Sequence, residues 1–215
     1  MDMNSFKGAI FDLDGTIIDS AYVWAEVDRQ FVARRGLALP DDYGRAVSSM
    51  NFDQAAAYTK KRFGLPDSIE SITNEWKQQA IEEYRLNVKP IPGACEYLKM
   101  LKGRGVKIAL ATASDRVLYT PALKRMGMFE LFDHFSQTSD VARGKGFPDV
   151  YEHAAEGLSL SACECMVFED IPEGLKGASD GGFYSVAVTC AAGKYDIAEL
   201  ERYSDMVIRD FTELL

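Results

Sequence analysis

The stretch Gly8-Ala9-Ile10-Phe11-Asp12-Leu13-Asp14-Gly15-Thr16 decides the fold that this chain is expected to adopt. Its apolar first part is typical of a buried strand, which we place at residues 6–12. Side chains two apart on a strand point to the same side, so Asp12 and Asp14 are expected to project together where the strand ends. Gly15 allows a tight turn, and Thr16 is expected to cap a following helix. Neighbouring carboxylates are costly unless a cation or a shared proton compensates them, so the stretch indicates a reaction centre.

The composition narrows the classes of function. The chain has 215 residues, enough for one domain or for one domain with a smaller insertion. Its formal net charge of −9 argues against a nucleic-acid partner, because nucleic acids are bound by basic surfaces. No stretch has the pattern of a membrane span or a signal peptide, and the four cysteines are expected to be reduced. We therefore expect a cytoplasmic protein without a membrane partner, either a monomer or a weak dimer.

Two sequence patterns divide the chain. Between residues 17 and 88 the apolar residues recur at helical spacing, which predicts a small all-helical cap domain. The two-proline stretch Val88-Lys89-Pro90-Ile91-Pro92-Gly93 marks its end. Residues 1–16 and 89–215 are expected to form an α/β core, a Rossmann-like doubly wound parallel sheet, because predicted strands alternate there with helices. Besides the first strand, those strands are predicted at 106–111, 165–168, 183–188 and 206–208.

Polar residues follow the first strand and two later ones. Asp12 and Asp14 follow the first, Thr112-Ala113-Ser114 the second, and Glu169-Asp170 the strand at 165–168. Ligands of parallel sheets bind beyond the carboxyl ends of the strands, so these residues are expected to meet at one edge. Lys145 stands in a glycine-flanked loop just ahead of a helix. Four carboxylates at one edge are an oxygen-rich set that suits Mg²⁺, together with water and a substrate phosphate.

These residue types point to phosphoryl transfer. Asp12 is a candidate nucleophile, because a carboxylate is already ionised at neutral pH and can form an aspartyl-phosphate. Asp14 is placed to protonate the leaving oxygen and then to deprotonate the attacking water. Thr112 and the amides after it could hold phosphate oxygens at a helix N-terminus, and Lys145 could offset the phosphate charge. A histidine-based zinc site or a Ser-His-Asp triad is disfavoured, because the chain has only two histidines.

Four short motifs resemble, in the same order, those of the haloacid-dehalogenase-like superfamily. They are Asp12-Leu13-Asp14-Gly15-Thr16, Thr112-Ala113-Ser114, Lys145 with Pro148-Asp149, and Phe168-Glu169-Asp170. The resemblance covers the whole chain. The helical insertion between the first and second motifs resembles the cap of the subgroup that holds β-phosphoglucomutase and many small-molecule phosphatases. The resemblance implies a cap that closes to exclude bulk water and to select the substrate.

The same resemblance implies a role for each motif residue. Asp12 is the implied nucleophile, Asp14 the implied general acid and base, and Lys145 the group that orients and neutralises the phosphate. The implied phosphate-binding residues are Thr112, Ala113 through its amide, and Ser114. The implied Mg²⁺ ligands are Asp12, the backbone carbonyl of Asp14, Asp170, and Glu169 in or near the coordination shell.

One loop departs from the family pattern. Members often have Gly-Lys-Pro ahead of Pro-Asp, whereas this chain has Gly144-Lys145-Gly146-Phe147-Pro148-Asp149. Gly146 leaves the loop freer than proline would. The motif identifies Lys145 as the lysine of the site. Because of Gly146, the motif does not determine whether its side chain reaches Asp12.

Residues outside the motifs are candidates for substrate contact. Arg45 could bind a distal phosphate or a sugar hydroxyl, with a solvated arginine as the alternative. Arg116, at the start of the helix after Ser114, could approach the substrate. Trp24 and Trp76 are expected in the core of the cap rather than as platforms for a substrate.

Three functions are compatible with these residues. The first is a Mg²⁺-dependent phosphatase of a small phosphorylated metabolite, a sugar phosphate or a nucleotide, and Asp14 favours phosphate esters over dehalogenation or phosphonate cleavage. The second is a sugar phosphomutase like β-phosphoglucomutase, although residues 17–27 lack the cap histidine and lysine of such relatives. The third is a non-catalytic binding protein, which the intact motif set disfavours.

Overall fold

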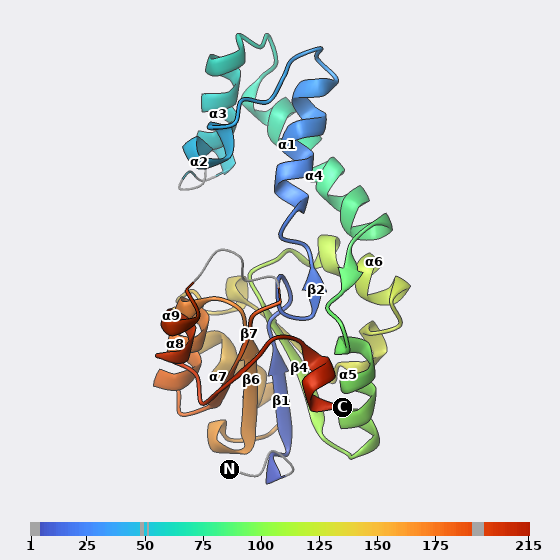
Figure 1. The fold of residues 1–215 in the computed structure, drawn as a ribbon, viewed down its shortest axis with the longest axis vertical. Coiled ribbons are helices and arrows are strands. Elements are labelled where there is room, and N and C mark those ends of the chain that lie inside the picture. Colours follow the sequence, from blue (N-terminus) through green and yellow to red (C-terminus); the bar gives the residue numbers. More distant parts are fainter. Residues whose placement is uncertain (1–4, 48–49, 51, 191–195) are drawn as a thin grey trace. The chain divides into compact units, whose positions relative to one another are not determined.

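The computed structural model of the chain describes residues 5–47, 50, 52–190 and 196–215. It divides into two compact units, one made of Met1–Ala21 with Val88–Leu215 and the other of Tyr22–Asn87. The first unit is an α/β domain and the second is all-helical, as Figure 1 shows.

The centre of the first unit is a six-stranded sheet in the order β5-β4-β1-β6-β7-β8. Every neighbouring pair of strands is parallel, so the predicted parallel sheet is confirmed. The expected strand at 6–12 is shorter, and β5 was not predicted, because its polar residues lack a strand-like apolar run. The strands are β1 (Gly8–Phe11), β4 (Lys107–Thr112), β5 (His134–Gln137), β6 (Cys165–Glu169), β7 (Tyr184–Val188) and β8 (Met206–Ile208).

Helices of this unit pack against the sheet, with α7 on β1, β4 and β5 and α8 on β6 and β7. Successive side chains of each strand point to opposite faces of the sheet, and both faces are covered by apolar residues. Ile10 and Val167 join the cluster that contains Tyr151 of α7. Phe11 stacks on Phe168, with ring centroids 4.6 Å apart. The helices are α5 (Ala94–Gly103), α6 (Arg116–Arg125), α7 (Asp149–Gly157), α8 (Pro172–Asp180) and α9 (Ile197–Glu201), with short 3₁₀ turns at Phe129–Leu131, Thr138–Asp140, Ala162–Glu164 and Phe211–Leu214.

The boundary between the units lies later than the sequence predicts. Residues 17–21 were expected in the helical domain, but they belong to the α/β unit. There β2 (Ile18–Asp19) pairs antiparallel with β3 (Lys89–Pro90), and the Ile91 amide donates to the Ile17 carbonyl at 2.9 Å. No helix begins at Thr16, because Gly15 turns the chain with a φ of +90° and β2 follows the turn.

The second unit contains α1 (Val23–Ala33), α2 (Tyr43–Val47), α3 (Phe52–Phe63) and α4 (Ile69–Leu86). Both α1 and α3 pack on α4, whose N-cap Ser68 accepts a hydrogen bond from the Ser71 amide. Trp76 is buried between Phe31 and Phe52, as expected, whereas Trp24 is 43% exposed and touches Phe52 from outside. Trp24 was therefore wrongly expected in the core. Among the residues described, no helix combines the length and apolar character of a membrane span.

Candidate active site

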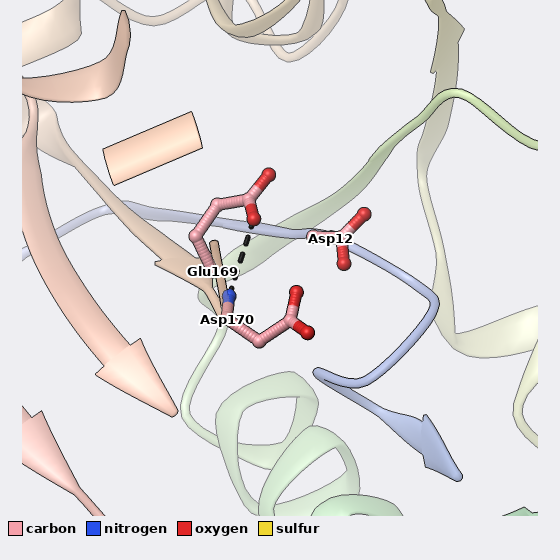
Figure 2. Close-up of side chains that lie close together, drawn as sticks. All are labelled: Asp12, Glu169 and Asp170. Atoms are coloured by element: carbon pink, nitrogen blue, oxygen red, sulfur yellow. Dashed lines mark hydrogen bonds between the residues drawn. The ribbon is translucent and has the colours of Figure 1, made fainter. Parts of the chain in front are cut away.

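Three carboxylates meet at the carboxyl ends of the two central strands. Phe11 of β1 lies beside Phe168 of β6, so the residues that follow, Asp12 and Glu169-Asp170, come together. One oxygen from each of the three carboxylates lies within 4.8 Å of the others. Asp12 and Glu169 are buried, at 3% and 0% exposure. Figure 2 shows the three side chains gathered beyond the strand ends, with the Asp170 amide donating to Glu169 Oε2 at 3.2 Å.

Lys145 supplies a positive charge to this cluster. Its ammonium forms an ion pair with Asp12 and another with Glu169 Oε1 at 2.6 Å. Only a tenth of the lysine side chain is exposed. The reach of the lysine is therefore settled despite Gly146, since the loop brings Lys145 directly onto Asp12.

The loop that carries Lys145 is held from two sides. Arg143 donates to both carboxylate oxygens of Asp149, at 3.0 and 2.6 Å, which closes the loop onto the first turn of α7. On the other side, Gly177 of α8 faces the Lys145 carbonyl so closely that a Cβ at Gly177 would overlap it. The absence of a side chain at Gly177 thus lets the lysine loop pack directly against α8.

Burial controls the charge state of the cluster. Burial raises the pKa of Asp12 well above its ordinary 3.8, although the Lys145 ammonium opposes this shift. Burial also raises the pKa of Asp170 to about 7, and the Glu169 carboxylate adds to the effect. For Lys145, burial alone would lower the pKa, but Asp12 and Glu169 outweigh it and the pKa is raised. Three carboxylates thus face one lysine, and the raised pKa values of Asp12 and Asp170 show that it does not offset all of their charge. A bound cation would compensate the remainder, and the all-oxygen donor set fits a hard divalent one.

Asp14 lies outside this trio and has its own partners. Its Oδ1 accepts a hydrogen bond from Ser20 at 2.6 Å, and its Oδ2 accepts one from the Ser114 hydroxyl. Ser114 belongs to the predicted second motif, so the structure brings these two motifs together. Ser20 is buried and was not predicted, because it lies beyond the turn and belongs to no motif.

The second motif is ordered by its own hydrogen bonds. Thr112 is buried, and its hydroxyl accepts a hydrogen bond from the Ser114 amide at 3.0 Å. The Ser114 carbonyl accepts another from Gln137 of β5, also at 3.0 Å. Ala113, between the two, is exposed. Thr112, the Ala113 amide and Ser114 all stay candidates for phosphate binding, because the Thr112 hydroxyl accepts in this hydrogen bond and keeps its own proton to donate.

The two candidate arginines are not placed at the cluster. Arg116 is exposed, with its guanidinium carbon 5.5 Å from the centre of the Phe135 ring. The side chain of Arg45 in α2, like the neighbouring residues 48–49 and 51, lies outside the described part of the structure. Both arginines stay predictions.

Tight backbone approaches shape the acidic cluster. A Cβ at Gly15 would overlap the Asp170 carboxylate, and one at Gly174 of α8 would overlap the Glu169 carboxyl group. The Thr16 hydroxyl lies 3.5 Å from Asp170 Oδ1, which gives it a partner in place of the expected helix cap. Tyr151 of α7, which no motif reasoning singled out, donates to Glu169 Oε1 at 2.8 Å.

Known proteins share this architecture. The family model of the haloacid dehalogenase-like hydrolases matches residues 6–182. The chain is 28% identical over 209 residues to validoxylamine A 7'-phosphate phosphatase of Streptomyces hygroscopicus subsp. limoneus, covering 97% of this chain and 96% of that protein. It is 27% identical over 202 residues to beta-phosphoglucomutase of Bacillus subtilis, covering 85% and 83%.

A solved structure of the same family has a similar fold. It is a HAD family hydrolase from Deinococcus radiodurans R1 with bound phosphate and sodium, at a TM-score of 0.74 and 27% identity, covering 98% of this chain and 94% of that one. The sequence matches and the structural match each cover most of this chain. This chain belongs to the haloacid dehalogenase-like hydrolases, among relatives that include phosphatases and β-phosphoglucomutases.

Proposed function

We propose that this protein is a Mg²⁺-dependent phosphatase of a small phosphorylated metabolite and that it acts through a phosphorylated Asp12. The observation that carries the proposal is the buried ion pair between Lys145 and Asp12 beside two further carboxylates. Such an arrangement keeps a carboxylate oxygen poised for attack while positive charge stands ready for the incoming phosphate.

The proposed reaction has two steps, in which Asp12 and Asp14 divide the work. Asp12 attacks phosphorus and forms an aspartyl-phosphate, while Asp14 gives its proton to the leaving alcohol oxygen. Asp14 then takes a proton from water, which attacks phosphorus and releases phosphate and the Asp12 carboxylate. The Ser20 and Ser114 hydroxyls hold Asp14 in either state, because a hydroxyl can donate to a carboxylate or accept from a carboxylic acid.

Asp12 and Asp170 would hold the cation through their carboxylates, with the Asp14 carbonyl completing the protein's share. A bound Mg²⁺ would neutralise charge on the phosphate oxygens. The Thr112 hydroxyl and the Ala113 amide are the proposed grip on the phosphate, and the Ser114 hydroxyl can join them when Asp14 is protonated and no longer takes its proton. Lys145 holds Asp12 in place and adds a second positive charge.

A sugar phosphate is the substrate class that the relatives favour. Two of these relatives are a validoxylamine A 7'-phosphate phosphatase and a beta-phosphoglucomutase. A nucleotide is the alternative within the same chemistry.

A sugar phosphomutase is the second candidate, because β-phosphoglucomutase is among the relatives. The same residues would serve, with the phosphoenzyme passing its phosphate to a sugar hydroxyl instead of water. Phosphate release and isomer formation from β-glucose 1-phosphate separate the two. We expect release to dominate, and isomerisation that outruns release would establish the mutase.

A panel of phosphate esters with Mg²⁺, with Asp12→Asn as the blank, tests the proposal. We expect the wild-type protein to release phosphate from at least one sugar phosphate or nucleotide and Asp12→Asn to lose this turnover while keeping the wild-type circular dichroism spectrum. Asp19→Asn, at an exposed carboxylate of β2, is the matched control and should keep its activity. Turnover that survives in Asp12→Asn would refute the nucleophile. A wild-type protein inert on the panel and unable to bind beryllofluoride with Mg²⁺ would instead support a binding protein.

A further inference from the structure

We propose that Tyr151 is a positioning residue whose hydroxyl keeps Glu169 as the partner of Lys145 and holds it back from the cation of the site. This inference rests on the proposed function, since it concerns how the same cluster is set for attack by Asp12. The Tyr151 side chain is buried and belongs to none of the four motifs.

The carboxylate of Glu169 is occupied by donors from within the chain. Its Oε1 accepts hydrogen bonds from Lys145 at 2.6 Å and from Tyr151 at 2.8 Å, and its Oε2 accepts one from the Asp170 amide at 3.2 Å. A carboxylate has about four acceptor positions, so about one is left for anything else. Gly174 packs against the carboxyl group and Glu169 is fully buried, so the group has little room to turn.

Tyr151 and Lys145 reach the same oxygen from one continuous segment. Lys145 lies in the loop before α7, and Tyr151 lies in the first turns of that helix, where its amide donates to the Pro148 carbonyl at 3.0 Å. The tyrosine ring is fully buried in the core cluster with Ile10 and Val167 and meets the Phe183 ring edge-on at 6.2 Å. The phenol oxygen is therefore held in place by packing against the sheet, independently of Glu169.

Two donors on one oxygen set how strongly Glu169 attracts other cations. Each donor withdraws negative charge from the carboxylate, and the phenol does so without adding a net charge. Without the phenol, Glu169 would draw the Lys145 ammonium toward itself and away from Asp12. With one donor fewer, its carboxylate would also be freer to turn an oxygen toward a cation held by Asp12 and Asp170. The Tyr151 hydroxyl thus keeps Glu169 paired with Lys145. Asp12 and Asp170 are then the carboxylates that bind the cation.

Tyr151→Phe tests this role, because it removes only the hydroxyl and keeps the ring in the core. We expect kcat to fall about tenfold, the effect of one hydrogen bond to a charged group, with KM changed by less than about twofold. Isothermal titration with Mg²⁺ alone should show binding about threefold tighter than in the wild type. Tyr119→Phe is the matched control, since the Tyr119 hydroxyl is buried on α6 without a hydrogen-bond partner among the described residues, and it should leave both quantities unchanged.

A double-mutant cycle with Glu169→Gln shows whether Tyr151 acts through Glu169. In the Glu169→Gln background the added Tyr151→Phe should change kcat and the Mg²⁺ dissociation constant by less than about twofold. Effects of Tyr151→Phe that are the same in both backgrounds would overturn the proposal, as would unchanged Mg²⁺ binding in the single variant. If the wild type turns over no phosphate ester, the proposed function fails, but the Mg²⁺ titrations of the same four proteins still decide the role of Tyr151.

Discussion

Gly15 has two separate reasons to be glycine. Its φ of +90° lies in a region that residues with a Cβ avoid, and it turns the chain from β1 toward β2. In addition, a Cβ there would overlap the Asp170 carboxylate, one of the proposed ligands. The first reason concerns folding and the second concerns the site, so a single substitution affects both.

Gly15→Ala should therefore cost more than backbone strain. Gly127 is the matched control in the same unit, with a φ of +69° and no atom within 4 Å of an added Cβ. Gly127→Ala should lower the free energy of unfolding by about 1–2 kcal/mol. Gly15→Ala should lower it by about 1–3 kcal/mol more, because Asp170 must move. Urea denaturation and Mg²⁺ titration measure both effects. Equal losses of stability with unchanged Mg²⁺ affinity would show that the overlap does not matter.

The helix α8 contains residues that allow close packing against its neighbours, although they are poor helix formers. Its sequence Pro-Glu-Gly-Leu-Lys-Gly-Ala-Ser-Asp contains two glycines, each of which weakens a helix by about 1 kcal/mol relative to alanine. Gly174 faces the Glu169 carboxyl group and Gly177 faces the Lys145 carbonyl. The helix thus approaches both partners of one ion pair at backbone distance, which explains why poor helix formers stand at these positions.

Three helices of the second unit share a buried polar contact. The Tyr43 hydroxyl of α2 bonds to Thr59 of α3 at 2.6 Å and lies 3.5 Å from the Asp28 carboxylate of α1. Burial raises the pKa of Asp28 to about 6, although the hydrogen bond from Tyr43 lowers it in part. The folded protein therefore holds a proton on Asp28 at pH 5 that the unfolded chain has released.

This difference predicts a pH-dependent stability. The raised pKa stabilises the folded state fully below pH 3.8, and this contribution is lost as pH rises to about 6. Asp28→Asn should remove the loss and raise the free energy of unfolding at pH 8 by about 1–2 kcal/mol, with a smaller gain at pH 5. Asp41→Asn, at an exposed carboxylate, is the control. Thermal unfolding at both pH values decides, and an equal shift at pH 5 and pH 8 would contradict the assignment.

At the scale of the whole molecule, the site is assembled from distant parts of one unit. The chain leaves the α/β unit after Ala21 and returns at Val88, yet β1 pairs directly with β4. Lys145 meets Asp12 and Ser114 meets Asp14 across 133 and 100 residues, respectively. The net charge of −9 adds to the local negative charge, so the folded protein gains from a bound cation.

Mg²⁺ should therefore stabilise the folded protein by mass action. At a hundred times its dissociation constant, Mg²⁺ should add about 2.7 kcal/mol to the free energy of unfolding of the wild type. Asp170→Asn should respond little to Mg²⁺. In EDTA at pH 8 the variant should be more stable than the wild type, because burial raises the pKa of Asp170 to about 7 and its charge is then costly. Thermal unfolding with Mg²⁺, EDTA and matched NaCl measures this reversal, and parallel shifts in both proteins would exclude Asp170 as a ligand.

Several features could be predicted because they depend on short spacings. The alternation of strands and helices predicts the parallel sheet, and the placement of Asp12, Thr112, Glu169 and Asp170 after strands predicts that they meet at one edge. The short polar strand β5 and the exposure of Trp24 carry no such pattern. The boundary at Ala21 also escaped prediction, because the pairing of β2 with β3 joins residues about seventy positions apart.

What the sequence by itself determined is the family, the order of the motifs and the residue types for phosphoryl transfer, because these follow from local pattern. Only the tertiary structure decided that Lys145 reaches Asp12 through a glycine-containing loop, that Ser20 and Ser114 hold Asp14, and that Tyr151 binds Glu169. The stretch from Gly8 to Thr16 shows why. A strand period places its carboxylates at the end of the sheet, but the partners that set their charge come from other strands, loops and helices. Tertiary packing brings those partners together, and the spacing of residues along the chain does not predict it.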